Sequence, residues 1–169
     1  MNLQVFEFNM LPTNTYIVWD DTKEAILIDP GCYYAGEKET LKRFLASENL
    51  TVRHILCTHF HFDHVFGVPF AEELCGIRCE AHPGDAWWTE HNADEVKKFG
   101  IPYPGEPASI GVPLADGDII RFGGTELQCL HTPGHSPGGM SFYDSVNGVV
   151  FVGDSLFASG GMGRTDLHG

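Results

Sequence analysis

Residues 52–64 read VRHILCTHFHFDH, an apolar run followed directly by a cluster of potential metal ligands. The first part is rich in apolar and β-branched residues, so it predicts a buried strand that stops where the histidines begin. The cluster places His59, His61, Asp63 and His64 within six residues. Because open α/β sheets carry their sites on the loops that follow strands, we expect a functional site on this loop.

The spacing of these four side chains suits metal binding. In an extended or tightly turned loop, His59 and His61 can point the same way, whereas Asp63 and His64 begin a helix and can face a second point nearby. Imidazole nitrogens together with carboxylate oxygens suit zinc, and also iron or manganese. Four such groups would be costly as unpaired residues in the core. The interpretation that competes with a metal site is therefore a polar loop exposed to solvent.

Two later segments each present one more ligand after a predicted strand. Residues 132–139, TPGHSPGG, predict a rigid turn that presents His135. Residues 152–157, VGDSLF, place Asp154 at the end of another apolar run. A carboxylate has two oxygens and can bridge two cations, which an imidazole does not ordinarily do. Both segments favour the metal-site interpretation.

The rest of the chain predicts one α/β domain over residues 1–169. A length of 169 residues suits one hydrophobic core, and 43% hydrophobic with 20% charged residues is ordinary for a soluble globular protein. Short apolar runs separated by turn residues predict strands that outnumber the helices. We expect helices at residues 36–49, 65–74 and 83–99, and a Pro- and Gly-rich surface loop at residues 101–113.

Charge and cysteine usage narrow the possible partners. The formal net charge of −13 disfavours binding to nucleic acid or to an anionic membrane. The N-terminal residues lack the basic region and continuous apolar run of a signal peptide. Five cysteines without a CxxC pair argue against a disulfide framework, so we expect a cytoplasmic protein. The sequence does not indicate an oligomeric state.

The HxHxDH cluster, the TPGHSPGG turn and the GDSLF segment followed by GRTD at residues 163–166 resemble the metallo-β-lactamase superfamily. Within it, the chain resembles the bacterial glyoxalase II-like hydrolases, from about residue 8 to residue 169. The resemblance implies a four-layered αββα sandwich with the site at one edge. It implies two metal ions, with zinc the first expectation. The implied ligands are His59, His61 and His135 for the first metal, Asp63 and His64 for the second, and Asp154 as the bridge.

The resemblance also implies a reaction, the hydrolysis of a small-molecule thioester or ester by a metal-bound hydroxide. A cation lowers the pKa of its bound water from about 15.7 to about 7, so hydroxide forms at neutral pH. Asp63 is the catalytic candidate, because it could accept a hydrogen bond from the nucleophile as well as bind metal. Asp29, within residues 25–31, resembles an aspartate that orients a ligand imidazole. The alternative is a plain turn residue before Pro30.

One departure from the family leaves alternatives open. The family supplies a further histidine and a closing strand and helices beyond Asp154, and we expect these C-terminal parts to be missing. His168 aligns with no family ligand and is expected on the surface. One alternative is a persulfide dioxygenase-like enzyme with a single iron held by His59, His135 and Asp154. The other is a degenerate metal-binding domain without catalysis.

The remaining histidines and the tryptophans receive structural interpretations. His54 falls inside a predicted strand, His82 at a strand end and His91 in a polar helix. His131 is expected to pack rather than to bind metal. Trp87 and Trp88 are expected in the core or in a pocket wall.

Overall fold

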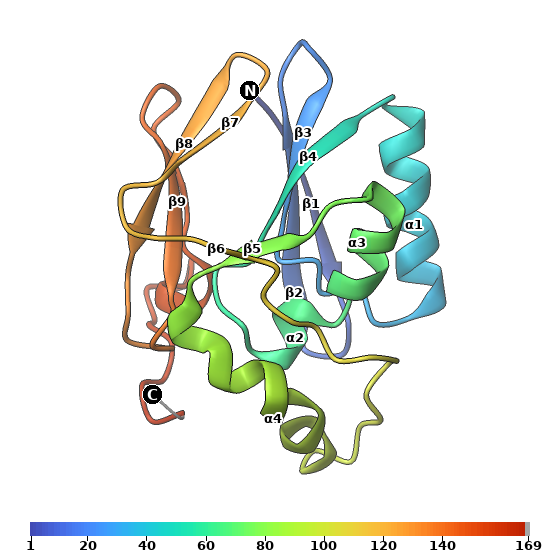
Figure 1. The fold of residues 1–169 in the computed structure, drawn as a ribbon, viewed down its shortest axis with the longest axis vertical. Coiled ribbons are helices and arrows are strands. Elements are labelled where there is room, and N and C mark those ends of the chain that lie inside the picture. The colour runs from blue at the N-terminus through green and yellow to red at the C-terminus, as the bar shows by residue number, and fades with distance from the viewer. Residues whose placement is uncertain (168–169) are drawn as a thin grey trace.

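The computed structural model describes residues 1–167, in which two sheets face each other (Figure 1). The expectation for His168 lies outside these residues. The strands are β1 (Asn2–Phe8), β2 (Thr13–Trp19), β3 (Glu24–Ile28), β4 (Thr51–Leu56), β5 (Cys79–Ala81), β6 (Val112–Pro113), β7 (Ile119–Phe122), β8 (Thr125–His131), β9 (Met140–Asp144) and β10 (Val149–Phe151). The helices are α1 (Ala35–Ser47), α2 (Phe62–Val65), α3 (Val68–Cys75) and α4 (Ala86–Lys97), with 3-10 turns η1 (Pro83–Asp85) and η2 (Gly153–Ser155).

The two sheets differ in strand direction. The first has the order β1-β2-β3-β4-β5-β6; its first three strands run antiparallel, and β3 to β6 run parallel. The second, β10-β9-β8-β7, is antiparallel throughout. Parallel neighbours need a crossover, and α1 supplies the one between β3 and β4, while α2 and α3 lie between β4 and β5.

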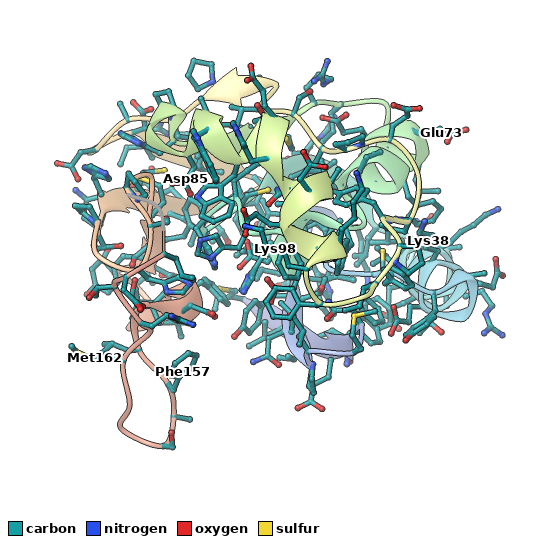
Figure 2. The ribbon with its side chains drawn as sticks, turned by 90° about the horizontal axis from the view of Figure 1, so that it is seen from below. Lys38, Glu73, Asp85, Lys98, Phe157 and Met162 are labelled. Carbon is teal, nitrogen blue, oxygen red and sulfur yellow. The ribbon has the colours of Figure 1, made fainter. Side chains whose placement is uncertain are left out.

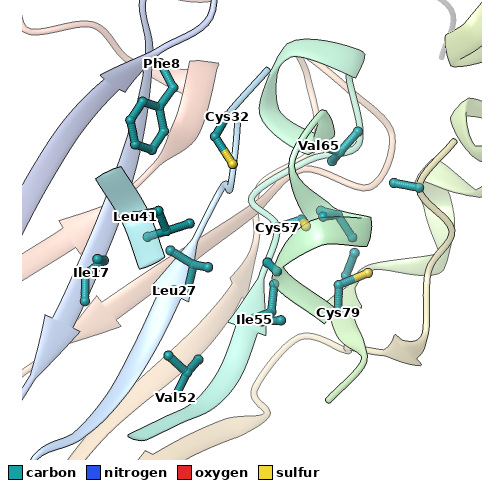
Figure 3. Close-up of a cluster of buried hydrophobic side chains, with 14 of the residues drawn as sticks. Phe8, Ile17, Leu27, Cys32, Leu41, Val52, Ile55, Cys57, Val65 and Cys79 are labelled. Carbon is teal, nitrogen blue, oxygen red and sulfur yellow. The ribbon is translucent and has the colours of Figure 1, made fainter. Parts of the chain in front are cut away.

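Strand β3 shows why both faces of the first sheet are buried. Side chains alternate across a strand, and here both alternating sets are apolar and have no exposed surface. Ala25 and Leu27 pack in the cluster that includes Leu41 of α1 (Figure 3). Ile26 and Ile28 pack against the second sheet. Full burial of each larger side chain contributes about 1.5–3 kcal/mol.

The layers run helix, sheet, sheet across the described part of the chain. Helices α1 and α3 cover the first sheet on the side away from the second (Figure 1). The outer face of the second sheet carries no helix from residues 1–167. The resemblance implied a four-layered αββα sandwich without its C-terminal parts, and residues 1–167 form three of those layers. Among the same residues, no helix has the length and apolar character needed to cross a bilayer.

Two sequence-based expectations of local structure were wrong. The helix expected at residues 65–74 begins only at Val68, as α3, and Val65 instead ends the separate short helix α2. Pro69 explains the break, because proline lacks an N–H and its ring clashes with the carbonyl of the residue four positions earlier, Val65. The Gly67 N–H donates instead to the carbonyl of Pro30, at 2.8 Å. The expected loop at residues 101–113 ends in strand β6, which pairs with β5.

Candidate metal centre

Three loops meet at one edge of the facing sheets. The first follows β4 and carries the HxHxDH cluster, the second follows β8 and carries His135, and the third follows β10 and carries Asp154. A backbone hydrogen bond joins the first loop to the second sheet, since the Met140 N–H donates to the Thr58 carbonyl at 2.7 Å. The strand ends therefore bring together ligands that lie far apart in the sequence.

His59, His61 and His135 form the first ligand group, in which one nitrogen from each ring lies within 4.8 Å of the others. His61 Nδ1 faces His135 Nε2 at 2.9 Å. His59 Nε2 is buried without a hydrogen-bond partner among the described residues, while its Nδ1 lies 3.1 Å from Thr58 Oγ1. An unpartnered buried nitrogen is costly, and a cation that accepts its lone pair removes the cost. The three rings therefore fit a cation.

The electrostatics of this group favour neutral rings. Burial, followed by the charges of His64 and His61, lowers the pKa of His59 well below its ordinary value. Burial, followed by the charge of His135, lowers the pKa of His61 to about 3. Both rings are therefore unprotonated near neutral pH, with the lone pairs that metal binding requires.

His59, His64 and Asp154 form the second ligand group, again within 4.8 Å. Asp154 reaches into both groups: its Oδ1 lies 3.3 Å from His64 Nε2 and its Oδ2 lies 3.5 Å from His135 Nε2. Asp63 lies beside the second group and outside both sets, with Oδ2 at 3.6 Å from His64 Nε2. Five of the six sequence-derived ligands thus fall in two sets that share His59, and the sixth is adjacent.

Carboxylates in and around the second group set its electrostatics. Burial alone would lower the pKa of His64, but the nearby charges of Asp63 and Asp29 raise it well above the ordinary value. Burial disfavours the ionised form of Asp154, yet the hydrogen bond from His64 and its charge hold the pKa of this carboxyl below its usual value. The second group is therefore rich in negative charge, which attracts a cation.

Asp29 has both of the roles that the sequence left open. It occupies a turn at a positive φ of 50° after β3. Its Oδ2 lies 3.0 Å from His64 Nδ1 and also accepts a hydrogen bond from Thr58 Oγ1 at 2.6 Å. Its Oδ1 accepts the Thr58 N–H at 2.7 Å. This carboxylate fixes the ring of His64 and the residue that precedes His59.

The sequence profile of the Metallo-beta-lactamase superfamily matches residues 9–169. The chain belongs to this superfamily. It is 32% identical over 174 residues to hydroxyacylglutathione hydrolase GloC of Haemophilus influenzae, covering 99% of the chain and 77% of that relative.

Two solved structures share the fold. The crystal structure of the B3 metallo-beta-lactamase BLEG-1 gives a TM-score of 0.85 with 34% identity, over 99% of this chain and 78% of that one. TTHA1623, solved in a di-iron-bound form, gives a TM-score of 0.84 with 36% identity, over 98% and 78%. The fold class expected from the sequence is confirmed, and a histidine-rich metal-binding site is typical of the superfamily.

Two cavities border the two ligand groups. One of about 390 Å³ is lined by His61, His135, Trp88 and Phe99, with Phe157 from the loop that Figure 2 shows projecting from the molecule. The other, of about 500 Å³, extends over β2 and η2. Asp63 and Asp154 line both cavities, so a substrate in either one lies next to the ligand groups.

The other histidines among residues 1–167 lie outside the ligand groups. His54 Nδ1 is 2.6 Å from Glu80 Oε1, and the rings of His82 and His131 stack with centroids 4.1 Å apart. His91 stacks on Trp87 at 3.8 Å. These contacts agree with the structural interpretations of the histidines. Trp88 is buried and lines the cavity beside His61, as expected, whereas Trp87 is 38% exposed and does not lie in the core.

Sequence reasoning missed several residues that support the ligands. Thr13 Oγ1 donates to Asp63 Oδ2 at 2.8 Å, and Thr58 joins Asp29 to His59. Asp85, whose carboxylate accepts hydrogen bonds from the Phe60 N–H and the Ser136 hydroxyl, was missed as well. The position of Thr58 directly before His59 was the only signal in the sequence, because Thr13 and Asp85 lie far from the cluster along the chain.

Proposed function

We propose that this protein is a metal-dependent hydrolase that cleaves a thioester. The observation that carries the proposal is the pair of ligand groups that share His59, with the two oxygens of Asp154 directed at a ring in each group. A carboxylate between two groups of imidazoles suits a pair of cations. The name of the relative GloC, a hydroxyacylglutathione hydrolase, supports a thioester substrate.

The proposed cations are two zinc ions per chain, since imidazole and carboxylate ligands suit zinc. Iron is an alternative, because TTHA1623 was solved in a di-iron-bound form. His59, His61 and His135 would hold the first ion, and His64, Asp63 and Asp154 would complete the second. Such ions supply Lewis acidity, which polarises a carbonyl and lowers the pKa of water to about 7.

Asp63 is the residue of this chain that we assign to the attacking water. The Thr13 hydroxyl and the His64 ring both contact Oδ2 of Asp63, which fixes the carboxylate. Oδ1 can then accept a hydrogen bond from water in either adjoining cavity. The attack adds the water oxygen to the acyl carbon, breaks the carbon–sulfur bond and releases a carboxylic acid and a thiol.

The cavity beside His61 favours a substrate with apolar parts. Phe62, Trp88, Phe99 and Phe157 form much of its wall. Arg164 also lines it, but this guanidinium is bound to Asp166 by two hydrogen bonds of 2.6 and 2.7 Å. A thiolate leaving group needs little help from a proton donor, which suits these walls. With a net charge of −13, a small molecule fits the site better than a nucleic acid.

The test joins elemental analysis to a thioester assay. Protein purified without added metal is analysed for zinc, iron and manganese, then assayed on S-D-lactoylglutathione and on a thioester of a small neutral thiol. We expect about two metal ions per chain and hydrolysis that stops after chelation and returns with zinc. Asp63→Asn should retain metal in the first group but lose most turnover.

Three outcomes would contradict the proposal. Hydrolysis that persists after complete metal removal excludes metal dependence. One iron per chain with oxygen consumption on a persulfide favours the dioxygenase alternative. Protein that takes up no metal indicates the degenerate domain.

A further inference from the structure

We propose that Asp85 and Asn92 form a brace that sets the positions of His59, His61 and His135 before any cation binds. The brace consists of these two side chains and the backbone groups that they hold. The inference rests on the metal centre of the proposed function and does not depend on the substrate.

Asp85 joins the two loops that carry the first ligand group. It lies at the junction of η1 and α4 and is 1% exposed (Figure 2). Its Oδ2 accepts the Phe60 N–H at 2.9 Å and the Ser136 hydroxyl at 2.9 Å. Its Oδ1 accepts the Gly138 N–H at 2.6 Å. One carboxylate therefore holds the residue after His59 and the residue after His135.

Asn92 completes the control of Phe60. This side chain comes from the middle of α4, has no exposed surface, and donates from Nδ2 to the Phe60 carbonyl at 2.8 Å. Phe60 is the only residue between His59 and His61. Because its N–H is held by Asp85 and its carbonyl by Asn92, the peptide groups on both sides of Phe60 are fixed. The separation of the two imidazoles is fixed with them.

The turns around this brace are in close contact. A Cβ atom added to Gly138 would lie 2.6 Å from the Asp85 backbone nitrogen and 2.7 Å from its Cγ. A Cβ added to Gly84 would lie 3.0 Å from the Pro137 carbonyl oxygen. There is no space for a side chain at either point, so η1 fits directly against the turn that follows His135.

The energetic cost of the brace argues for a role beyond packing. A buried carboxylate is unfavourable unless it is hydrogen-bonded, and among the described residues Asp85 has no cationic partner. Asn92 Oδ1 is buried with no hydrogen-bond partner within residues 1–167. Apolar side chains of similar size would avoid both costs but would leave the Phe60 N–H, the Phe60 carbonyl and the Gly138 N–H without these partners. The polar groups are explained if they position the ligand backbone.

The test compares Asp85→Asn with a matched control, Asp144→Asn. Asp144 is also 1% exposed and accepts three hydrogen bonds, from the Val146 N–H, the Asn147 N–H and Asn147 Nδ2. It lies at the end of β9 opposite to the turn that carries His135. Both substitutions remove a buried carboxylate charge, but only one of them touches the ligand loops.

Two readouts separate positioning from stability. Zinc affinity is measured by competition with a chromophoric chelator, and amide hydrogen exchange at Phe60 and Gly138 is followed in the metal-free protein. Asp85→Asn should weaken zinc binding about 10- to 100-fold and speed exchange at both amides. Asp144→Asn should lower the melting temperature while leaving affinity and these two exchange rates unchanged.

Two results would overturn the proposed brace. Wild-type affinity in Asp85→Asn, or an equal loss in Asp144→Asn, would overturn it. If Asp85→Asn does not fold, Asn92→Leu takes its place, because it removes the donor to Phe60 together with the unpartnered Oδ1. It should speed exchange at His61, whose N–H shares the released peptide group, and weaken zinc binding. If the wild-type protein binds no metal, the proposed function fails, whereas the exchange rates still decide the brace.

Discussion

The two halves of the metal centre hold their ligands by opposite means. The first half, His59, His61 and His135, consists of imidazoles only, and burial lowers the pKa of His59 and His61. In the second half, carboxylates raise the pKa of His64 well above its ordinary value, although burial alone would lower it. One half supplies neutral lone pairs and the other supplies negative charge.

The two halves also differ in the contacts that position their ligands. In the first half, the brace formed by Asp85 and Asn92 holds the backbone of Phe60, between two of the ligands. The second depends on direct contacts between side chains, with Asp29 and Asp154 on either side of His64. Asp154 contacts a ligand in both halves. The expected effect of a substitution therefore depends on whether it changes one half or both.

The largest effect is expected from Asp154→Ala. It removes the carboxylate that reaches both His64 and His135, so both cations should be lost together. We expect thioester hydrolysis to fall at least about 1,000-fold, which corresponds to about 4 kcal/mol of transition-state stabilisation. Metal content and turnover are measured on the same preparation, with circular dichroism as the control for folding. A variant that retains both would refute the assignment of Asp154 as the bridge.

The next-largest effect is expected when one ligand is removed from each half in turn. His61→Ala should lose the first cation and His64→Ala the second, because neither ring belongs to the other group. Each variant should therefore fall from about two metal ions to about one. Elemental analysis and the visible spectrum after cobalt substitution distinguish the ion that remains. If both variants lose all metal, the halves do not bind independently and the comparison fails.

A smaller effect is expected from Asp29→Asn. The substitution keeps the shape of the side chain but removes the charge that faces His64 Nδ1. We expect about 10- to 100-fold weaker binding of the second cation, as is usual when a partner of a ligand imidazole is lost. Stepwise zinc titration measures the two affinities separately. An equal loss in the first affinity would show that Asp29 also acts through Thr58, which it contacts directly.

The sequence predicted the local part of the site better than the part that depends on the fold. His59, His61, Asp63 and His64 lie within six residues, so their spacing alone indicates a metal site. His135 and Asp154 were candidates because each follows a predicted strand, but placing them in the same site required the resemblance to a family, since only the pairing of strands brings them to the same edge.

Other features could not be predicted because they depend on contacts between distant residues. Asp85 and Asn92 lie in a polar helical segment where such residues are common, and only the tertiary structure places them against Phe60. Strand β6 is two residues long and contains a proline, so its composition predicted a loop. The order of the six-stranded sheet likewise results from long-range packing.

The smallest effect concerns a pair outside the centre, His54 on β4 and Glu80 on β5, which matches the pairing of His64 with Asp29. The hydrogen bond to Glu80 raises the pKa of His54, against the effect of burial. A raised pKa in the folded state adds stability that is complete below the unfolded pKa of about 6.5 and is lost as the pH rises through the folded value. Glu80→Gln should therefore lower the free energy of unfolding of the metal-free protein at pH 6, by no more than about 1 kcal/mol, and by less at pH 9.

The matched control for this pair is Glu126→Gln, which breaks the exposed pair with Arg121. A guanidinium keeps its charge throughout this range, so the effect of Glu126→Gln should not change between pH 6 and pH 9. Urea unfolding at both pH values gives the four free-energy differences. A Glu80→Gln effect that is equal at the two pH values would mean that the pair acts as a neutral hydrogen bond. The resemblance to His64 and Asp29 would then be one of geometry alone, and the charge of the second half would be specific to the metal centre.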